Sequence, residues 1–233
     1  MAAAGYMNLG DYSQVERDLF LRFEATLEDA GFTYLSVPSF ISRGTVERQE
    51  VVAWEHVLKV SDTLGLAGSA EQGILEYFAD TRVAEGRYWA HNQCFRGEDE
   101  VIPWARLREF RKTELFSFTN DVEWNVEVLH LLKTATSFLE DLGLVYRLVD
   151  KTGDPGYHKK KTDVEVWTYS YGWIETHSCT YFGEEQTRRF GITGATHTVS
   201  NTGLASPRIL IPLVEDSTPD SGPGPRTVAK VWA

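Results

Sequence analysis

Apolar positions near the start of the chain follow the period of an α-helix. The pattern predicts a helix over residues 11–30 that ends at Gly31. Its apolar side chains recur every four positions: Val15, Leu19, Phe23 and Leu27. The next segment, Thr33 to Ile41, is typical of a strand that Pro38 interrupts, because proline in a sheet belongs at an edge or a bulge.

Farther along the chain, helix-like and strand-like patterns are mixed. We expect a helix and then a strand within 44–62, a small-residue loop at 65–73, and helices at 74–85, 121–142, 184–190 and 203–214. The helix at 121–142 is expected to bury one face: Val122, Val126, Leu129, Ala135, Leu139 and Leu142. Alternating patterns predict strands at 88–96, 107–118, 145–149, 163–169, 173–182 and 196–202.

This order of elements predicts the fold class. Runs of antiparallel-type strands between a few helices indicate an α+β fold, with a central antiparallel sheet flanked by helices. The chain has neither a G-x-x-x-x-G-K-[ST] motif nor a helix-opening G-x-G-x-x-G, so P-loop and Rossmann nucleotide sites are not indicated. We expect a leader at 1–10, one domain at 11–215 and a Pro/Gly-rich tail at 216–233.

Composition narrows the class of protein. The 233 residues carry a net charge of −11 and are 42% hydrophobic, which suits a globular domain and disfavours a surface that binds nucleic acid throughout. No apolar run is long enough to span a membrane, and the chain does not open with a signal-peptide pattern. Two cysteines, Cys94 and Cys179, are too few for a disulfide framework, so a cytoplasmic location is expected.

A first group of candidate functional residues lies on and between the strands predicted at 88–96 and 107–118. Period-two alternation places Arg96 with Glu98, and Arg106 with Phe110, on shared faces, so an antiparallel pair would gather these side chains on one surface. Arginine binds phosphate oxygens bidentately, and a phenylalanine ring can stack on a purine. The alternative is a solvated sheet face with cross-strand ion pairs.

A second group surrounds the strands predicted at 163–169 and 173–182. Carboxylates at strand ends beside a hydroxyl group suit Mg²⁺, which prefers oxygen ligands. Regular alternation puts Glu175 and Ser178 on opposite faces, so a joint site requires a bulge. His177 and Cys179 lack nearby Cys or His residues, so a buried structural cysteine is expected rather than a zinc site or a Cys–His pair.

A third group centres on Arg208, which lies in the apolar stretch 205–214 after a turn of small residues. A buried arginine must be paired with a carboxylate or must meet an anionic ligand, because an unpaired buried charge is costly. Glu184 or Glu185 is the alternative structural partner.

In this order and spacing, the three groups resemble the motifs of class II aminoacyl-tRNA synthetases, specifically the seryl-tRNA synthetase catalytic core. The resemblance covers residues 11–215. In the first part of the chain, motif 1 is matched by Phe23–Phe40 with Pro38, and the family's Thr-Ala-Glu loop by Gly68-Ser69-Ala70-Glu71. Motif 2 is matched by CFRGE and REFRKTELFSF. The segment that follows is matched by DVEVW and ETHSCTYFGEEQTRRFGI, and motif 3 by HTVSNTGLASPR.

The resemblance implies a role for each matching residue. ATP would be bound by Arg96, Glu98, Arg106, Phe110 and Arg208. The catalytic set would be Arg96, Arg208 and Glu175, and Mg²⁺ would be held by Glu175 and Ser178. The amino acid would be faced by Ser69, Glu71, Glu114, Ser200 and Thr202.

The implied activity is ATP-dependent amino acid activation to an aminoacyl-adenylate, which needs positioned charge and a metal rather than a nucleophilic side chain. The short hydroxyls and Glu114 favour a small or polar amino acid. The related amino acid:[carrier protein] ligases hold zinc with two cysteines and a glutamate. Ser69 and Ser200 fall at or near those cysteine positions here, so zinc is not expected.

Several departures from seryl-tRNA synthetases bear on the acceptor of the amino acid. Motif 1 starts near residue 11 without a preceding tRNA-binding arm, and the connection between Glu98 and Arg106 is short for a motif 2 loop. Ser200 replaces the usual Asn, and Pro212 is expected to bend the motif 3 helix. We therefore expect transfer to a carrier-protein phosphopantetheine thiol or a small amine, rather than to tRNA.

Two other functions stay open: tRNA aminoacylation helped by a separate tRNA-binding partner, and a non-catalytic paralogue that binds a nucleotide. A homodimer is implied by the resemblance, and Phe20, Phe23 and Phe40 offer apolar surface for it. The basic run Lys159-Lys160-Lys161 is either a docking site for an acidic carrier protein or a solvated loop.

Overall fold

The computed structural model describes residues 10–154 and 156–216, so almost all of the predicted leader and tail lie outside the described residues. A seven-stranded sheet forms the centre, in the order β1-β5-β6-β11-β9-β8-β7. Its strands are β1 (Thr33–Tyr34), β5 (Gly86–Phe95), β6 (Glu109–Thr119), β7 (Tyr146–Asp150), β8 (Lys160–Thr168), β9 (Gly172–Gly183) and β11 (His197–Ser206). Two small sheets pair β2 (Phe40–Ser42) with β3 (Leu64–Leu66), and β4 (Arg82–Val83) with β10 (Thr193–Gly194).

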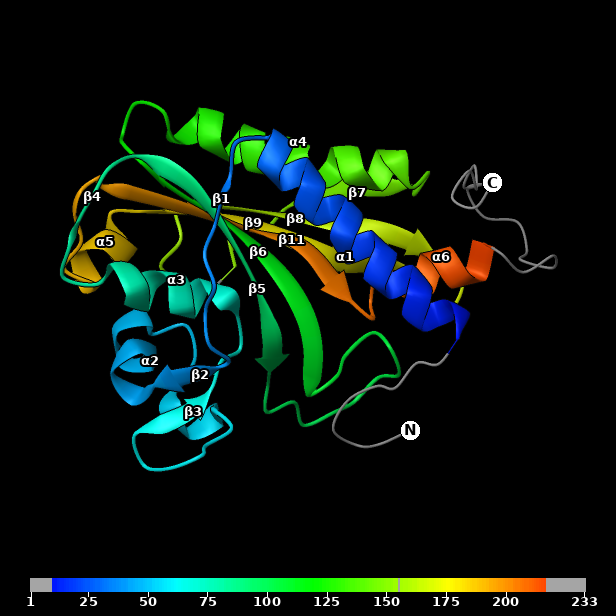
Figure 1. Ribbon diagram of the computed structural model, residues 1–233, viewed down its shortest axis with the longest axis horizontal. Coiled ribbons are helices and arrows are strands. Elements are labelled where there is room, and N and C mark those ends of the chain that lie inside the picture. The colour runs from blue at the N-terminus through cyan, green and yellow to red at the C-terminus, as the bar shows by residue number, and fades with distance from the viewer. Residues whose placement is uncertain (1–9, 155, 217–233) are drawn as a thin grey trace.

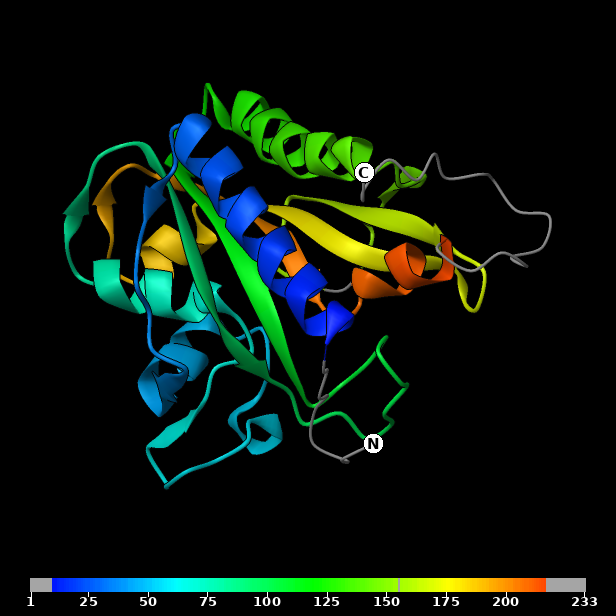
Figure 2. The same ribbon diagram turned by 45° about the vertical axis from the view of Figure 1, so that its right-hand side comes forward.

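The helices cover the two faces of the large sheet unequally (Figures 1 and 2). Two long helices, α1 (Asp11–Asp29) and α4 (Trp124–Asp141), lie side by side over one face. The short helices α2 (Arg43–Gln49), α3 (Ala70–Phe78) and α5 (Glu185–Arg189) gather at one end of the other face, and η1 (Trp54–His56) and α6 (Leu210–Asp216) complete the set. No helix in the described part of the chain is long and apolar enough to span a membrane.

Side-chain alternation along the central strand β6 divides the core in two. Leu115 belongs to the core under α1 and α4, whereas Phe116 and Phe118 belong to the core under α3 and α5. Most strand pairs are antiparallel, and this arrangement confirms the predicted α+β class. Two pairs are parallel: the edge strand β1 with β5 in the large sheet, and β4 with β10 in a small sheet.

Several predicted boundaries near the N-terminus are wrong. The strand expected from Thr33 to Ile41 is two short strands, because the chain leaves the large sheet before Pro38 and pairs again in a separate sheet. Within 44–62 the helix is followed by a 3₁₀ turn and a single bridge residue, Lys59, in place of the expected strand. The helix expected at 74–85 begins at Ala70, because the Ser69 hydroxyl accepts a hydrogen bond from the backbone N–H of Glu71 at 3.2 Å and caps it.

The buried face of α4 also differs from the prediction. Val122, Val126 and Leu129 are 83%, 55% and 67% exposed, whereas Ala135, Leu139 and Leu142 are buried as expected. The rest of the packed face consists of Val128, Leu131, Leu132 and Phe138. This helix carries apolar residues on more than one side, and periodicity alone does not tell which side meets the sheet.

The C-terminal region contains a longer strand than the pattern predicts. β11 continues to Ser206, so the helix expected from 203 starts only at Leu210. Pro212 is therefore in the first turn of α6, where backbone N–H groups lack helical partners and proline does not bend the helix. In this extension Ala205 pairs with Lys112 and Ser206 pairs with Arg111 of β6.

Two of the aromatic residues expected at a dimer surface belong to the core. Phe23 is fully buried and Phe20 is 7% exposed, because both point from α1 toward the sheet. Phe40 is 49% exposed. Of the three residues expected at the dimer surface, Phe40 is therefore the one that is exposed.

Gly203 shows how tightly α1 packs against β11. A Cβ atom at this position would lie 2.6 Å from Cε1 of Phe23 and 3.1 Å from Cγ of Leu115.

We predict that Gly203→Ala lowers the free energy of unfolding by about 1–3 kcal/mol, because it overpacks a filled core. Urea denaturation measures the effect. Gly153→Ala is the matched control, since nothing lies within 4 Å of its added Cβ; equal stability of the two variants would contradict the packing described here.

Candidate active site

The short helices leave part of one sheet face uncovered, and a cleft of about 580 Å³ opens there. A smaller cavity of about 60 Å³ adjoins it, and the two share Arg96, Glu98, Lys112, Glu175 and Thr202. Every residue that the sequence assigned to the site lines one or both: Ser69, Glu71, Arg96, Glu98, Arg106, Phe110, Glu114, Glu175, Ser178, Ser200, Thr202 and Arg208. The fold thus brings all of the candidates together.

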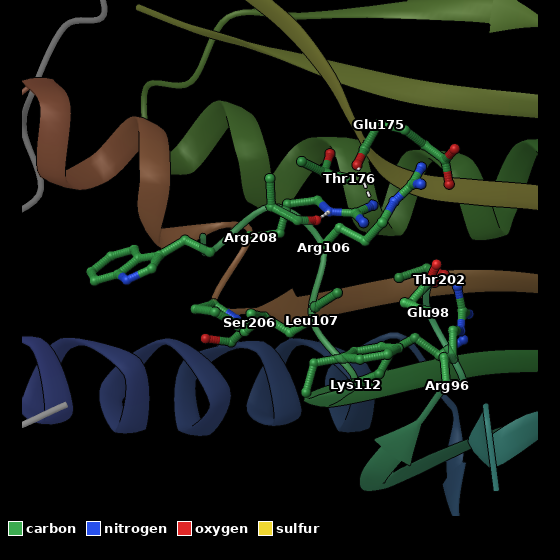
Figure 3. A pocket seen from close by; sticks show the side chains of 15 residues that line it. Arg96, Glu98, Arg106, Leu107, Lys112, Glu175, Thr176, Thr202, Ser206 and Arg208 are labelled. Atoms are coloured by element: carbon green, nitrogen blue, oxygen red, sulfur yellow. Dashed lines mark hydrogen bonds between the residues drawn. The ribbon is translucent and has the colours of Figure 1, made fainter. Parts of the chain in front are cut away.

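Three arginines converge at the smaller cavity (Figure 3). The Nε of Arg208 donates to the carbonyl oxygen of Ala105 and its Nη1 donates to that of Glu175, both at 2.7 Å. Burial lowers the pKa of Arg208; the Glu175 carboxylate opposes this shift, and the positive charges of Arg96 and Arg106 add to it. Such a concentration of positive charge suits the oxygens of a polyphosphate.

The alternative partners proposed for Arg208 are wrong. Glu185 instead forms ion pairs with its helix neighbours Arg188 at 2.6 Å and Arg189 at 3.2 Å. The carboxylate that acts most strongly on the pKa of Arg208 is that of Glu175, which the sequence had assigned to the metal.

The connection from β5 to β6 carries Arg96, Glu98 and Arg106, which lie in a loop rather than on the strands. This loop folds back on itself, with the backbone N–H of Ile102 donating to the carbonyl of Arg106 at 2.9 Å. Arg208 and Tyr171 bind the carbonyls of Ala105 and Pro103 from outside. The guanidinium of Arg96 lies 5.1 Å from the ring centroid of Phe110, the ring expected to stack on adenine.

A bulge in β9 resolves the geometric conflict at the predicted metal site. The pairing with β8 shifts between Val164 and Glu165, so that Thr176 is the extra residue. Glu175 then stands opposite Glu165 and Ser178 opposite Asp163, which puts Glu175 and Ser178 on the same face. The distortion that a joint site requires is therefore present.

The side chains around Glu175 and Ser178 offer the oxygen ligands that Mg²⁺ prefers. The Ser178 hydroxyl donates to Oδ1 of the buried Asp163 at 2.6 Å, which leaves its lone pairs free for a cation. Glu175 touches solvent in the cleft, yet desolvation and the negative charge of Asp163 raise its pKa. A divalent cation would relieve this repulsion, so the residues fit a magnesium ion, with Asp163 as an additional contributor.

His177 is the buried residue between Thr176 and Ser178 in β9, and it contacts a second bulge. Its Nε2 lies 2.9 Å from the carbonyl oxygen of Gly203, where the pairing of β11 with β6 shifts, and its Nδ1 lies 2.8 Å from Oγ1 of Thr176. Desolvation lowers the pKa of His177 to about 4, so the imidazole is neutral at pH 7. Cys179 is buried as expected, and burial raises the pKa of its thiol.

The wide end of the cleft holds polar side chains suited to an amino acid. Phe110, Lys112 and Glu114 share one face of β6, as the alternation predicted. Lys112 forms a buried ion pair with Glu114, and the Ser69 hydroxyl donates to Oε2 of Glu114 at 3.0 Å. Thr202 stands opposite Glu114 on the neighbouring strand, so Glu114 is central to this polar pocket.

Glu71 is held by residues that the sequence analysis did not assign. Its Oε1 accepts hydrogen bonds from the amides of Gln49 at 2.6 Å and Gln186 at 2.9 Å. Burial and the nearby charge of Glu114 raise its pKa. Gln186 lies in the Gln-Thr-Arg-Arg segment that carried the resemblance, which was a usable signal, whereas Gln49 ends a short helix and gave none.

Comparisons with known proteins agree with this geometry. The family described as tRNA synthetase class II core domain (G, H, P, S and T) matches residues 56–214. The Deinococcus radiodurans protein named serine–tRNA ligase is 33% identical, over 91% of this chain and 56% of its own length. Its namesake from Caldicellulosiruptor bescii is 31% identical over 91% of this chain and 55% of its own length. The chain thus spans little more than half the length of these relatives.

Solved structures support the fold. The cytoplasmic serine-tRNA ligase from Naegleria fowleri in complex with AMP has a TM-score of 0.83 at 23% identity, over 93% of this chain and 57% of that chain. The seryl-tRNA synthetase from Pyrococcus horikoshii complexed with ATP has a TM-score of 0.79 at 23% identity, over 91% and 53% respectively. The family match and the sequence identities confirm the resemblance: this chain belongs to the class II aminoacyl-tRNA synthetase core family and is a homologue of the seryl-tRNA ligases.

Proposed function

We propose that the chain activates an amino acid with ATP to form an aminoacyl-adenylate. The observation that carries this proposal is the convergence of Arg96, Arg106 and Arg208 at one end of a cleft whose other end holds Glu114 and Ser69. One end has the charge to bind a polyphosphate, and the other has the hydrogen-bonding groups to bind a small zwitterion.

In this reaction an oxygen of the amino acid carboxylate attacks the α-phosphorus of ATP. The bond from that phosphorus to the bridging oxygen breaks, and pyrophosphate leaves. Arg96 lines both cavities, so it can bind the carboxylate and the α-phosphate together, while Arg106 and Arg208 bind the outer phosphates. Mg²⁺ held at Glu175 and Ser178 would neutralise phosphate charge. No side chain acts as a nucleophile, and rate acceleration comes from orientation and preset charge.

We further propose a small or polar amino acid as the substrate. Glu114 can accept hydrogen bonds from an ammonium group, and Ser69, Ser200 and Thr202 add short hydroxyls around it. That this pocket holds no zinc stays a prediction, which metal analysis of the purified protein tests.

We predict amino acid-dependent exchange of pyrophosphate into ATP in the presence of Mg²⁺. Arg96→Ala should lower the exchange rate about 10²–10³-fold, because it removes a positive charge that stabilises the transition state. Arg22→Ala is the control, since Arg22 is exposed on α1 over the opposite sheet face. Wild-type protein that exchanges pyrophosphate with none of the amino acids would refute the proposal.

For the acceptor, we propose a phosphopantetheine thiol of a carrier protein or a small amine. The sulfur or nitrogen would attack the adenylate carbonyl, and AMP would leave. The support is the short loop at 96–108, which is folded back and bound through its carbonyls to Arg208 and Tyr171. Lys159 and Lys160 are exposed beside the cleft, and their positive charges suit an acidic partner. Lys161 instead forms an ion pair, with its Nζ 3.5 Å from Oδ2 of Asp154.

A second candidate function is aminoacylation of tRNA. The observation that favours it is the 33% identity to a protein named serine–tRNA ligase. A cleft that makes an adenylate serves either acceptor, so the two candidates differ only in the second half-reaction.

Transfer assays with total tRNA, a holo-carrier protein and a panel of small amines separate these candidates. We predict acylation of the carrier protein or an amine and none of tRNA, because the loop between β5 and β6 is short and folded back on itself. The apo-carrier protein, which lacks the thiol, is the matched control. Efficient charging of tRNA without an added partner would overturn the acceptor proposal and leave activation intact.

We also propose that the protein is a cytoplasmic homodimer. The edge strand β1 ends the large sheet, and Tyr34 and Phe40 near it are 51% and 49% exposed. An isologous dimer is the commonest way to cover such a surface. Light scattering at micromolar concentration should give twice the chain mass of 26.4 kDa; a monomer mass would contradict the proposal.

A further inference from the structure

His177 is a buried polar residue to which the proposed reaction gives no role. It is 1% exposed and lines neither the cleft nor the smaller cavity. Cys179, two positions further along β9, belongs to the core beneath α1 and α4, so alternation puts the imidazole on that face of the sheet and not on the cleft face. His177 therefore touches no substrate in the cleft, and its effect on the reaction must pass through other residues.

One contact of His177 is with the backbone of a bulge. Gly203 is the residue at which the pairing of β11 with β6 shifts, and it has no paired residue in β6 or in β9. Its carbonyl oxygen lies 2.9 Å from Nε2 of His177. A carbonyl oxygen only accepts, so Nε2 carries a proton and donates it. This hydrogen bond replaces the one that the bulge removes from the sheet.

The other contact of His177 is with the extra residue of the bulge in β9. Its Nδ1 lies 2.8 Å from Oγ1 of Thr176, and the same hydroxyl oxygen lies 3.3 Å from the carbonyl oxygen of Val164. Thr176 is the residue that brings Glu175 onto the face of Ser178. The imidazole and the neighbouring strand β8 thus hold the side chain on which the geometry of this bulge depends.

Each bulge adjoins a different part of the proposed site. Thr176 follows Glu175, which is proposed to hold Mg²⁺. Gly203 follows Thr202, which stands opposite Glu114 in the pocket for the amino acid. Misplacing a substrate by about 1 Å can slow a reaction on the order of a hundredfold, so the position of each bulge matters for the reaction.

We propose that His177 is a positioning residue that orients both ends of the site, the metal side through Nδ1 and Thr176, and the amino acid side through Nε2 and Gly203. This inference rests on the proposed activation reaction. It assigns one task to each nitrogen of a single ring. A substitution can therefore remove one task and keep the other.

Two substitutions of His177 separate the tasks. The amide of asparagine reaches about as far as Nδ1 and that of glutamine about as far as Nε2, so His177→Asn keeps a polar group at Thr176 and His177→Gln keeps one at Gly203. In pyrophosphate exchange, His177→Asn should raise the KM for the amino acid about three- to tenfold, the size of one neutral hydrogen bond. It should leave the Mg²⁺ concentration for half-maximal exchange unchanged. His177→Gln should do the reverse.

Calorimetry without an amino acid gives a second readout, because no turnover occurs. Wild-type protein should bind ATP more tightly with Mg²⁺ than without it. His177→Gln and Thr176→Val should both reduce this gain about three- to tenfold, since both remove the contact at Nδ1, while His177→Asn should retain it. His130→Gln is the matched control, because His130 lies on α4, stacks on Phe32 at 5.6 Å and lines neither the cleft nor the smaller cavity.

The outcomes are distinguishable. If the two His177 variants fold and change both quantities equally, or change neither, the inference is overturned while the activation reaction stands. If neither folds, Thr176→Val decides, and an unchanged gain from Mg²⁺ overturns the inference. Wild-type protein that exchanges pyrophosphate with no amino acid refutes the activation reaction. The calorimetric comparison then still decides the metal side, which an unchanged gain in His177→Gln overturns.

Discussion

The geometry of the site depends on one buried imidazole. His177 lies between the bulge at Thr176 in β9 and the bulge at Gly203 in β11, and it contacts a polar atom at each. Without the first bulge, Glu175 and Ser178 would face opposite sides of the sheet. The second bulge sets where Thr202 stands beside Glu114. Because the imidazole is neutral, it bridges the two irregular segments without leaving a charge in the core.

Charge is separated along the cleft. Arginines dominate one end, where Glu98 and Glu175 also lie, while Glu71 and Glu114 supply negative charge at the other end, and Lys112 lies between the two regions in its ion pair with Glu114. Burial disfavours the charged form of each group and like charges nearby add to that effect: burial and then Arg96 and Arg106 lower the pKa of Arg208, while burial and then Asp163 raise the pKa of Glu175. Burying these charges without a ligand costs free energy, and a bound ligand of complementary charge lowers that cost.

The sequence predicted the residues of the site better than it predicted the path of the chain around them. Alternation along residues 107–118 was enough to put Phe110, Lys112 and Glu114 on one face, since a regular strand has a strict period of two. The bulge at Thr176 interrupts that period and arises from contacts with strands far away, so only the resemblance to a family indicated it. The same limit applies to α4, where several faces are apolar, and to Glu71, whose partners Gln49 and Gln186 come from two separate segments.

The contact between α1 and β11 has a consequence for the order of events during synthesis. The hydroxyl of Ser206 donates to Oε1 of Glu16 at 2.6 Å, and Phe23 packs where Gly203 leaves room. The helix is made long before the strand that covers it. The apolar face of α1 must therefore stay uncovered by this strand until nearly the whole described chain has left the ribosome, and contacts of such long sequence separation close slowly. During that interval the cleft is also incomplete, because β11 carries Ser200 and Thr202, which line it.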